Sequence, residues 1–203
     1  MENLSRKERD KIRHKKEILS EALNLFAEKG FHSVSMQDIA AGAGFGVGTL
    51  YNFFQSKEQL FEDLMNDCAE KIYQVLCPIL VGDLPEEAKL RLFINSHKKL
   101  AEDNIKFIKL YVSEYGTLTI VNGRSQKSND IKAAIHSNLL EIIQTGISKN
   151  VFRQVDSEIV VLSLMATLQA FIMESSKVYN ELKVRNGLMQ IEQFFFSMLL
   201  NVS

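Results

Sequence analysis

Little in this chain interrupts regular secondary structure. Its 203 residues include only two prolines and ten glycines, so few positions force a turn. A protein of many short strands needs frequent turn residues, whereas long helices need few. Hydrophobic residues make up 46% of the chain and charged residues 24%, which is enough to bury a core and to solvate a surface. The composition predicts an all-α globular protein.

Signals for export or membrane insertion are also lacking. Residues 1–16 are charged, and no apolar segment follows them as it would in a signal peptide. The longest apolar run, residues 159–173, is interrupted by three polar residues, so we expect no membrane span there. Cys68 and Cys77 lie nine residues apart in one expected helix, beyond the reach of a disulfide. We therefore expect a cytoplasmic protein with reduced thiols.

The net charge of the chain is small, but the charged residues are unevenly distributed. The formal net charge is −1, yet residues 1–16 carry seven basic and three acidic side chains, a net +4. Residues 58–203 carry 15 basic and 18 acidic side chains, a net −3. A basic leader on an acidic body suits an anionic partner at the N-terminal end. A solvated helix start would explain the same charge run equally well.

Apolar residues recur at helical spacing along most of the chain. The pattern predicts helices over about residues 11–28, 35–43, 47–54, 56–78, 86–100, 104–115, 131–143, 157–179 and 183–200. The helix over residues 157–179 is apolar on most sides and should be buried all round. Residues 116–129 are rich in glycine, serine and asparagine and predict a loop. Within them, residues 119–121 could form a strand, but no partner run lies nearby.

Two short predicted helices follow a longer one and are joined by a glycine-containing turn, residues 44–46. This order describes a helix-turn-helix, a motif that places its last helix in the major groove of DNA. At 100° per residue, Leu50, Phe53 and Phe54 of the last helix fall on one side and should pack inward. The opposite side of that helix is then free to face a partner.

The outward side has the chemistry of a DNA-binding surface. Thr49, Tyr51 and Asn52 can form hydrogen bonds with phosphates or base edges, and no acidic residue accompanies them. Gly48 has no side chain to hold the backbone away from a duplex. Lys57 begins the next helix, where free N–H groups and a positive charge suit another phosphate.

The run from Ser33 to Leu60 resembles the DNA-binding signature of the tetracycline-repressor (TetR) family. The similarity covers about residues 10–65, and the rest of the chain agrees only in length and helical content. The matching elements are Phe26, Gly30-Phe31, Ile39-Ala40, Ala43-Gly44, Gly48-Thr49-Leu50-Tyr51, Phe54 and Ser56-Lys57. The resemblance implies a homodimer of about nine helices per chain. It implies a helix-turn-helix domain over residues 1–57 and an effector-binding and dimerisation domain over residues 58–203.

The resemblance implies that Ser35, Gly48, Thr49, Tyr51 and Lys57 contact DNA. Arginines of the N-terminal arm could add minor-groove contacts. The full set of DNA-binding residues that we expect is Arg6, Arg9, Ser35, Gln37, Val47, Gly48, Thr49, Tyr51, Asn52 and Lys57. Two departures from the family pattern remove interactions. Gly46 stands where serine or threonine often caps the recognition helix, and Phe53 stands where tyrosine or histidine is common.

The C-terminal domain is expected to hold an apolar effector pocket and the dimer interface. Candidate pocket residues are Phe107, Tyr111, Tyr115, Phe152, Met165, Phe171 and Met173, although core packing is the alternative for each. The resemblance implies that the last two helices of each chain form a four-helix interface. Candidate interface residues are Leu164, Leu168, Ile191, Phe194, Phe195 and Met198, which could instead be intrachain core.

Other kinds of site find less support. The glycine run of residues 42–48 is not a dinucleotide loop, because a helix rather than a strand precedes it. His14, His32, His97 and His136 show no metal-ligand spacing, and no catalytic serine, cysteine or carboxylate motif is present. We expect no cofactor, no metal and no enzymatic activity.

The sequence thus predicts a sequence-specific DNA-binding transcriptional regulator. We expect a repressor that a small apolar or amphipathic effector releases from a palindromic operator. The alternative is an all-helical carrier or enzyme that binds small molecules without DNA, which would not explain the basic leader or the outward Tyr51 and Asn52. A third possibility is a DNA-binding protein with a structural role and no effector.

Overall fold

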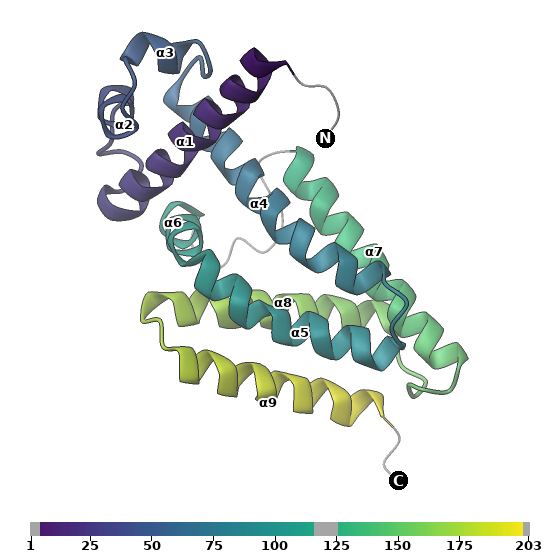
Figure 1. Cartoon of the computed structure of the whole chain (residues 1–203). Helices are drawn as coiled ribbons and strands as arrows, with labels where there is room; N and C mark the ends of the chain where they lie inside the picture. The colour runs from purple at the N-terminus through teal and green to yellow at the C-terminus, as the bar shows by residue number, and fades with distance from the viewer. Residues whose placement is uncertain (1–4, 116–125, 201–203) are drawn as a thin grey trace. The chain divides into compact units, whose positions relative to one another are not determined.

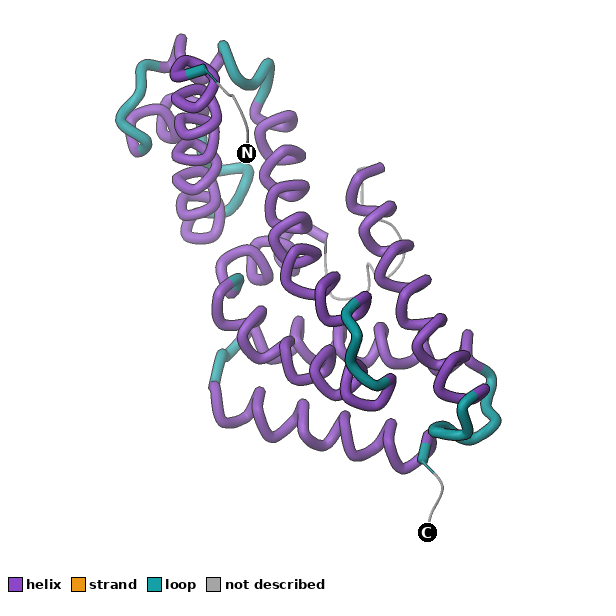
Figure 2. Tube along the Cα trace, turned by 45° about the vertical axis from the view of Figure 1, so that its right-hand side comes forward, coloured by secondary structure: helices purple, strands orange, loops and turns teal. Residues whose placement is uncertain are grey.

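The computed structural model describes residues 5–115 and 126–200, and over these ranges the chain forms nine α-helices and no strand (Figure 1). The prediction of an all-α fold is confirmed. The helices are α1 (Arg6–Lys29), α2 (Met36–Gly42), α3 (Val47–Tyr51), α4 (Lys57–Val81), α5 (Glu86–Asp103), α6 (Ile105–Tyr115), α7 (Gln126–Ser148), α8 (Ser157–Lys177) and α9 (Glu181–Leu199). Figure 2 shows short loops between most of these helices.

Internal packing divides the chain into two units, Met1–Asp67 and Cys68–Ser203. Helix α4 has 25 residues and belongs to both units. The sequence placed the domain boundary at the start of this helix, whereas the packing places it inside the helix. A single long helix can serve two cores because its buried residues change neighbours along its length.

The first unit is built around the buried side of α1. Ile18, Leu19, Ala22 and Phe26 are buried there at the spacing of three and four residues that the sequence shows. Helix α1 packs against α2, and α2 against α3. The other buried residues on α2, α3 and the start of α4 include Met36, Ile39, Ala40, Leu50 and Leu60. Burial of this apolar surface is what stabilises so small a unit. It also fixes which sides of α2 and α3 remain exposed.

Two turns of the first unit require glycine. Gly30 follows α1 with φ of 80°, and Gly44 lies between α2 and α3 with φ of 75°. A side chain is disfavoured in this left-handed region of backbone conformation. The predicted roles of both residues as helix stops agree with this geometry.

The second unit is a helical bundle with one continuous hydrophobic core. Helix α5 packs along α9 and α7, and α8 packs against α5, α6, α7 and α9. Leu90 and Ile94 of α5, Leu139 of α7, Leu164 of α8 and Phe195 of α9 are all buried in this core. Side chains of α5, α7, α8 and α9 therefore pack together in this one core.

Helix α8 differs from the prediction. It is not buried all round, because Ile159 and Leu162 are 63% and 59% exposed on one of its sides. By length and composition alone it is also long and apolar enough to cross a membrane, which the sequence analysis did not expect. In the bundle its other side is core, where Val161, Leu164 and Leu168 are buried. One exposed apolar side therefore remains.

The predicted loop over residues 116–129 is too long at its C-terminal end. Residues 126–129 belong to α7, and the Gln126 side chain donates to Asp130 Oδ1 across one helical turn at 2.8 Å. Polar residues at a helix start satisfy groups that the helix itself leaves open, so their composition alone does not indicate a loop. Residues 116–125, including the possible strand over 119–121, lie outside the described residues.

Candidate DNA-binding surface

Helix α3 presents a polar, open side. Leu50 is fully buried, whereas Tyr51 on the same short helix is 51% exposed. Gly48 is exposed, and a Cβ atom added there would meet nothing within 4 Å. Asn52 caps the helix and is exposed as well. The predicted outward side therefore has room for a duplex to approach.

The end of α3 departs from the prediction at Phe53. The helix ends at Tyr51, so Asn52 and Phe53 leave the helical periodicity that was used to place Phe53 inside. Phe54 is fully buried, but Phe53 is only partly so. The Phe53 ring instead lines a surface groove between α1 and the residues after α3.

The start of α3 has no side-chain cap, as expected for Gly46. Val47, at the same end of α3, is 37% exposed and presents an apolar side chain to the surface. A five-residue helix without a cap gains little from its own hydrogen bonds. Its position must come from the burial of Leu50 and Phe54.

The start of α2 is fixed by a capping box. The Ser35 hydroxyl accepts from the Asp38 backbone N–H at 3.1 Å and donates to Asp38 Oδ2 at 2.6 Å, and the Ser35 backbone N–H donates to the same oxygen at 2.8 Å. These bonds from Ser35 lower the pKa of the Asp38 carboxyl below its usual value. Gln37 is exposed on this first turn. The Ser35 hydroxyl is therefore already engaged within the chain.

Lys57 has a role that the sequence did not indicate. Its ammonium donates to the backbone carbonyls of Phe31 and Val34, both at 2.9 Å, and lies 4.4 Å from the centre of the Phe31 ring. Two of its three N–H donors are thus used inside the chain, rather than being free for phosphate as predicted. The side chain ties the α1–α2 connection to the start of α4. Its carbonyl partners lie 26 and 23 residues upstream, so no local pattern could reveal them.

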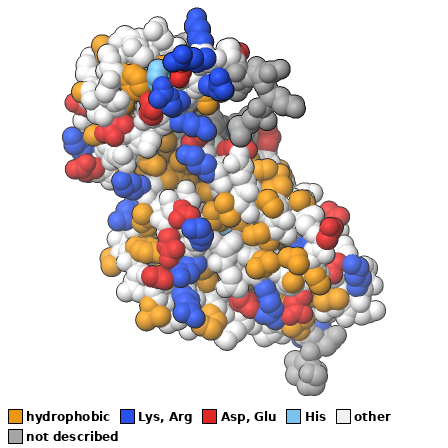
Figure 3. Space-filling view, in the orientation of Figure 1, with side chains coloured by type: hydrophobic (Ala, Val, Ile, Leu, Met, Phe, Trp, Pro, Cys, Tyr) orange, Lys and Arg blue, Asp and Glu red, His pale blue; other side chains and the backbone are white. Residues whose placement is uncertain are grey.

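Arg6 and Arg9 lie in a helix and not in an extended arm. A capping box of Ser5 and Glu8 begins α1 at Arg6, with the Ser5 backbone N–H donating to the Glu8 carboxylate at 2.8 Å. The two arginines are therefore presented by the first turns of a helix, and their contact with DNA stays a prediction. Figure 3 shows Lys and Arg side chains gathered around this end of the first unit.

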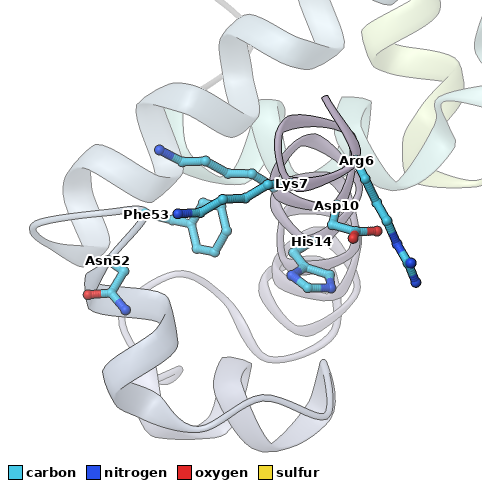
Figure 4. Close-up of a pocket in the computed structure, with 7 residues that line it drawn as sticks. Arg6, Lys7, Asp10, His14, Asn52 and Phe53 are labelled. Carbon is cyan, nitrogen blue, oxygen red and sulfur yellow. The ribbon is translucent and has the colours of Figure 1, made fainter. Parts of the chain in front are cut away.

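A groove runs between the first turns of α1 and the residues after α3 (Figure 4). Its volume is about 670 Å³, and its lining residues are Arg6, Lys7, Asp10, Lys11, His14, Asn52 and Phe53. Three of these are basic and one is acidic, and the acidic Asp10 pairs with Arg13 at 3.2 Å. The groove is therefore suited to an anion beside the recognition helix.

Five of the seven groove residues, all except Arg6 and Asn52, were not among the predicted DNA-binding residues. Lys7, Lys11 and His14 recur at spacings of four and three, which places them on one side of a helix. This spacing indicates one basic side of a helix, which the net charge of residues 1–16 alone does not reveal. The His14 ring also packs 5.0 Å from the ring of Phe45 in the α2–α3 turn, which connects α1 to the motif.

The expected pocket residues separate into two groups. Phe107 and Tyr111 lie together on α6 with ring centres 6.0 Å apart, and burial raises the pKa of the Tyr111 hydroxyl. Phe152 is buried and packs against Gly146, whereas Phe171 is partly buried and packs against Gly187. Met173 is buried and Met165 partly buried, and the Tyr115 side chain lies outside the description.

The expected interface residues also separate. Leu164, Leu168 and Phe195 are buried in the core of this chain and have no surface for a partner, which corrects their assignment. Ile191 and Met198 are partly buried against the same core. Phe194 is 57% exposed. Other exposed apolar residues on α8 and α9, which were not among the predicted interface residues, are Ile159, Leu162, Leu182 and Met189.

Comparisons with known proteins agree with this geometry. A family model described as bacterial regulatory proteins, tetR family, matches residues 18–64, which span α2, α3 and parts of α1 and α4. The HTH-type transcriptional repressor KstR2 of Rhodococcus jostii is 23% identical over 137 residues, 68% of this chain and 67% of that protein.

Solved structures share the fold over nearly the whole chain. The fatty acid degradation regulator FadR from Bacillus halodurans superposes with a TM-score of 0.73 at 22% identity and covers 90% of this chain and 94% of its own. FadR from Bacillus subtilis, solved in complex with stearoyl-CoA, gives a TM-score of 0.69 at 20% identity and covers 87% and 96%. The two-unit helical architecture is therefore that of known regulators.

Proposed function

The chain belongs to the TetR family of bacterial regulatory proteins, and we propose that its first unit binds operator DNA through α3, the first turn of α2 and the α1 groove. It is a DNA-binding transcriptional regulator and not an enzyme. The observation that carries the proposal is the exposed side of α3, with Tyr51 and Asn52 directed outward beside a groove lined by three basic side chains. Phosphate contacts would set the position of the unit, and α3 would read the bases.

We expect each part of this surface to make a different kind of contact with DNA. Thr49, Tyr51 and Asn52 supply hydrogen bonds, Gly48 permits close approach, and Val47 supplies an apolar contact to a thymine methyl group. Lys7 and Lys11 hold a phosphate of the flanking backbone in the groove. Lys57 acts mainly by shaping the connection before α2, and its remaining N–H can still point outward.

We further propose that the second unit dimerises through the exposed apolar side of α8 and α9. Exposed apolar residues on both helices support this, because a contiguous apolar surface is costly in water. A two-fold dimer would present two copies of α3 to half-sites about 34–36 Å apart on a palindromic operator. The protein would act in the cytoplasm, where the DNA is.

We also propose that a small apolar or amphipathic effector binds the second unit and releases the operator. Helices of this unit carry partly buried aromatic and sulfur-containing side chains, such as Phe107, Tyr111 and Met165, that a ligand could contact. The similar KstR2 is a transcriptional repressor, and the similar FadR has been solved with stearoyl-CoA. A difference of about 1–3 kcal/mol in effector affinity between the two states of the dimer would be enough for a usable switch.

The proposal is tested by selecting duplexes from a random library with the wild-type protein and measuring their binding by fluorescence anisotropy. We expect the selected duplexes to contain an inverted repeat. Tyr51→Ala should weaken binding by at least about tenfold, because it removes both a hydrogen bond and the contact area of an exposed ring. Tyr51→Phe is the matched control and should lose less, since the ring stays. Failure to enrich any sequence, or equal affinity of Tyr51→Ala and wild type, would contradict the proposal.

A further inference from the structure

A lysine occupies a core-facing position of α7. Ile135, Leu139 and Ile142 are buried on one side of this helix, and Gly146 continues the same side. These positions follow one another at spacings of four, three and four residues, which is the inward stripe of a helix. Lys132 lies three residues before Ile135 and therefore on the same stripe. Lys132 thus carries a charged ammonium group at a position of the inward stripe where the following turns of the helix have apolar side chains.

The Lys132 ammonium is buried and unpaired. Among the residues that the structure describes, no hydrogen-bond acceptor is found for its Nζ atom, which is shielded from solvent. Burial lowers the pKa of this group below the usual value for lysine. Several other lysines of the second unit pair with acids, as Lys98 does with Glu181 at 2.7 Å and Lys149 with Glu86 at 2.6 Å. An unpaired buried ammonium lowers the stability of the protein and needs an explanation.

Acidic side chains that meet α7 nearby are already committed. Glu158, at the start of α8, pairs with His136 at 2.9 Å, one turn after Lys132. Glu70 of α4 pairs with Lys127 at 3.0 Å, on the first turn of α7. Asp130 accepts a hydrogen bond from Gln126. These three acidic side chains therefore interact with other residues on this half of α7, and none of them accepts a hydrogen bond from Lys132.

We propose that Lys132 Nζ recognises the anionic head, a carboxylate or a phosphate, of an effector whose apolar part packs within the second unit. The inference rests on the proposed effector-binding function of that unit, and it adds the chemical class of the ligand. An ammonium in apolar surroundings gains more from an anion than one in water does, because the low local dielectric strengthens the attraction. A neutral ligand of equal length would bury the same hydrocarbon and leave the ammonium unpaired. Lys132 therefore selects an acid over the corresponding alcohol.

Straight-chain carboxylates from hexanoate to dodecanoate, alkyl phosphates of the same lengths and the matching alcohols test this by isothermal titration calorimetry on the full chain. We expect the wild type to bind at least one acid about tenfold or more tightly than its alcohol, the range of a charged hydrogen bond. Comparison of carboxylates with phosphates identifies the preferred head. Lys132→Met should bring acid and alcohol to within about twofold of each other.

Lys99→Met is the matched control, because Lys99 has 78% of its side chain exposed and pairs with Asp103 on the surface of α5. It removes the same charge and should keep the acid preference. Without ligand, Lys132→Met should melt at a higher temperature than the wild type, since an unpaired buried charge is replaced by an apolar chain of similar length. Lys132→Gln provides a second variant that also lacks the charge and should likewise lose the preference.

Three outcomes of the binding measurements would overturn the inference. They are the absence of binding by every acid in the series, equal affinity of acid and alcohol for the wild type, and an unchanged preference in Lys132→Met and Lys132→Gln. A lower melting temperature of ligand-free Lys132→Met would also contradict it, because that would indicate a partner within the chain. Operator binding by the same preparations is measured separately. A protein that binds the selected duplex but no acid fails only this inference, whereas one that binds acids but no DNA fails the proposed function.

Discussion

At the scale of single residues, hydrogen bonds formed within the chain determine how much of a polar side chain remains free for a partner. Lys57 shows this most clearly, because two of its three donors are spent on the carbonyls of Phe31 and Val34. We predict that Lys57→Met lowers the free energy of unfolding by about 1–3 kcal/mol, the range for hydrogen bonds to a charged group. Lys16→Met, at an exposed position of α1, should change it little. Urea unfolding followed by circular dichroism measures both, and equal stability of the two variants would refute the assigned role.

The Ser35–Asp38 capping box gives a residue-scale prediction that depends on pH. Hydrogen bonds from Ser35 depress the Asp38 pKa in the folded state, so they stabilise α2 above the pKa of the unfolded chain. That contribution is lost as the pH falls through the folded-state pKa of Asp38. Ser35→Ala should therefore raise the Asp38 pKa toward its usual value, and NMR titration of the carboxyl carbon measures it. The Glu8 carboxyl, lowered by its own box with Ser5, serves as the internal control and should not move.

At the scale of elements, the surfaces of α1 and α3 together form the groove beside the recognition helix. Lys7 and Lys11 lie on its wall, so the double variant Lys7→Gln/Lys11→Gln should weaken binding to all duplexes alike. The slope of log affinity against log salt should become shallower by about 0.9 for each phosphate contact that is lost. Anisotropy at several salt concentrations measures this slope. The control Lys29→Gln/Lys99→Gln removes equal charge elsewhere and should keep the wild-type slope.

The helices show what the sequence could and could not predict. Strong periodicity on α1 placed Ile18, Ala22 and Phe26 correctly in the core, because only one side of that helix is apolar. Helix α8 is apolar on most sides, so its pattern could not distinguish Leu164, which is buried, from Leu162, which is exposed. Phe53 was misplaced because α3 ends before it.

The candidate site was predictable to the extent that it is local. The outward side of α3 follows from spacing within five residues, and the groove residues of α1 could have been found from their own spacing. The partners of Lys57 could not be found, since they depend on how the α1–α2 connection returns to the start of α4. Likewise, the packing of Phe152 against Gly146 of α7, and of Phe171 against Gly187 of α9, depends on how these elements meet in the bundle.

At the scale of the whole molecule, the proposed function requires two chains acting together. Phe194 on α9 and Leu162 on α8 are more than half exposed in the single chain. We predict that Leu162→Asp/Phe194→Asp yields monomers in sedimentation velocity, because the charges would be buried without partners in the interface. Leu84→Asp, at an exposed apolar position outside α8 and α9, should remain dimeric. Dimers of the double variant would place the interface elsewhere.

The most direct test of the central claim, a dimer that reads two half-sites with its α3 helices, changes the spacing of the selected operator. Inserting five base pairs between the half-sites turns one of them by about half a helical turn, so the two recognition helices could no longer enter both major grooves. We expect the affinity, measured by anisotropy at fixed salt, to fall by at least about tenfold, and to stay low when ten base pairs are inserted, because the half-sites are then about one helical turn too far apart for one dimer. Equal affinity for the original and the five-base-pair duplex would contradict the account.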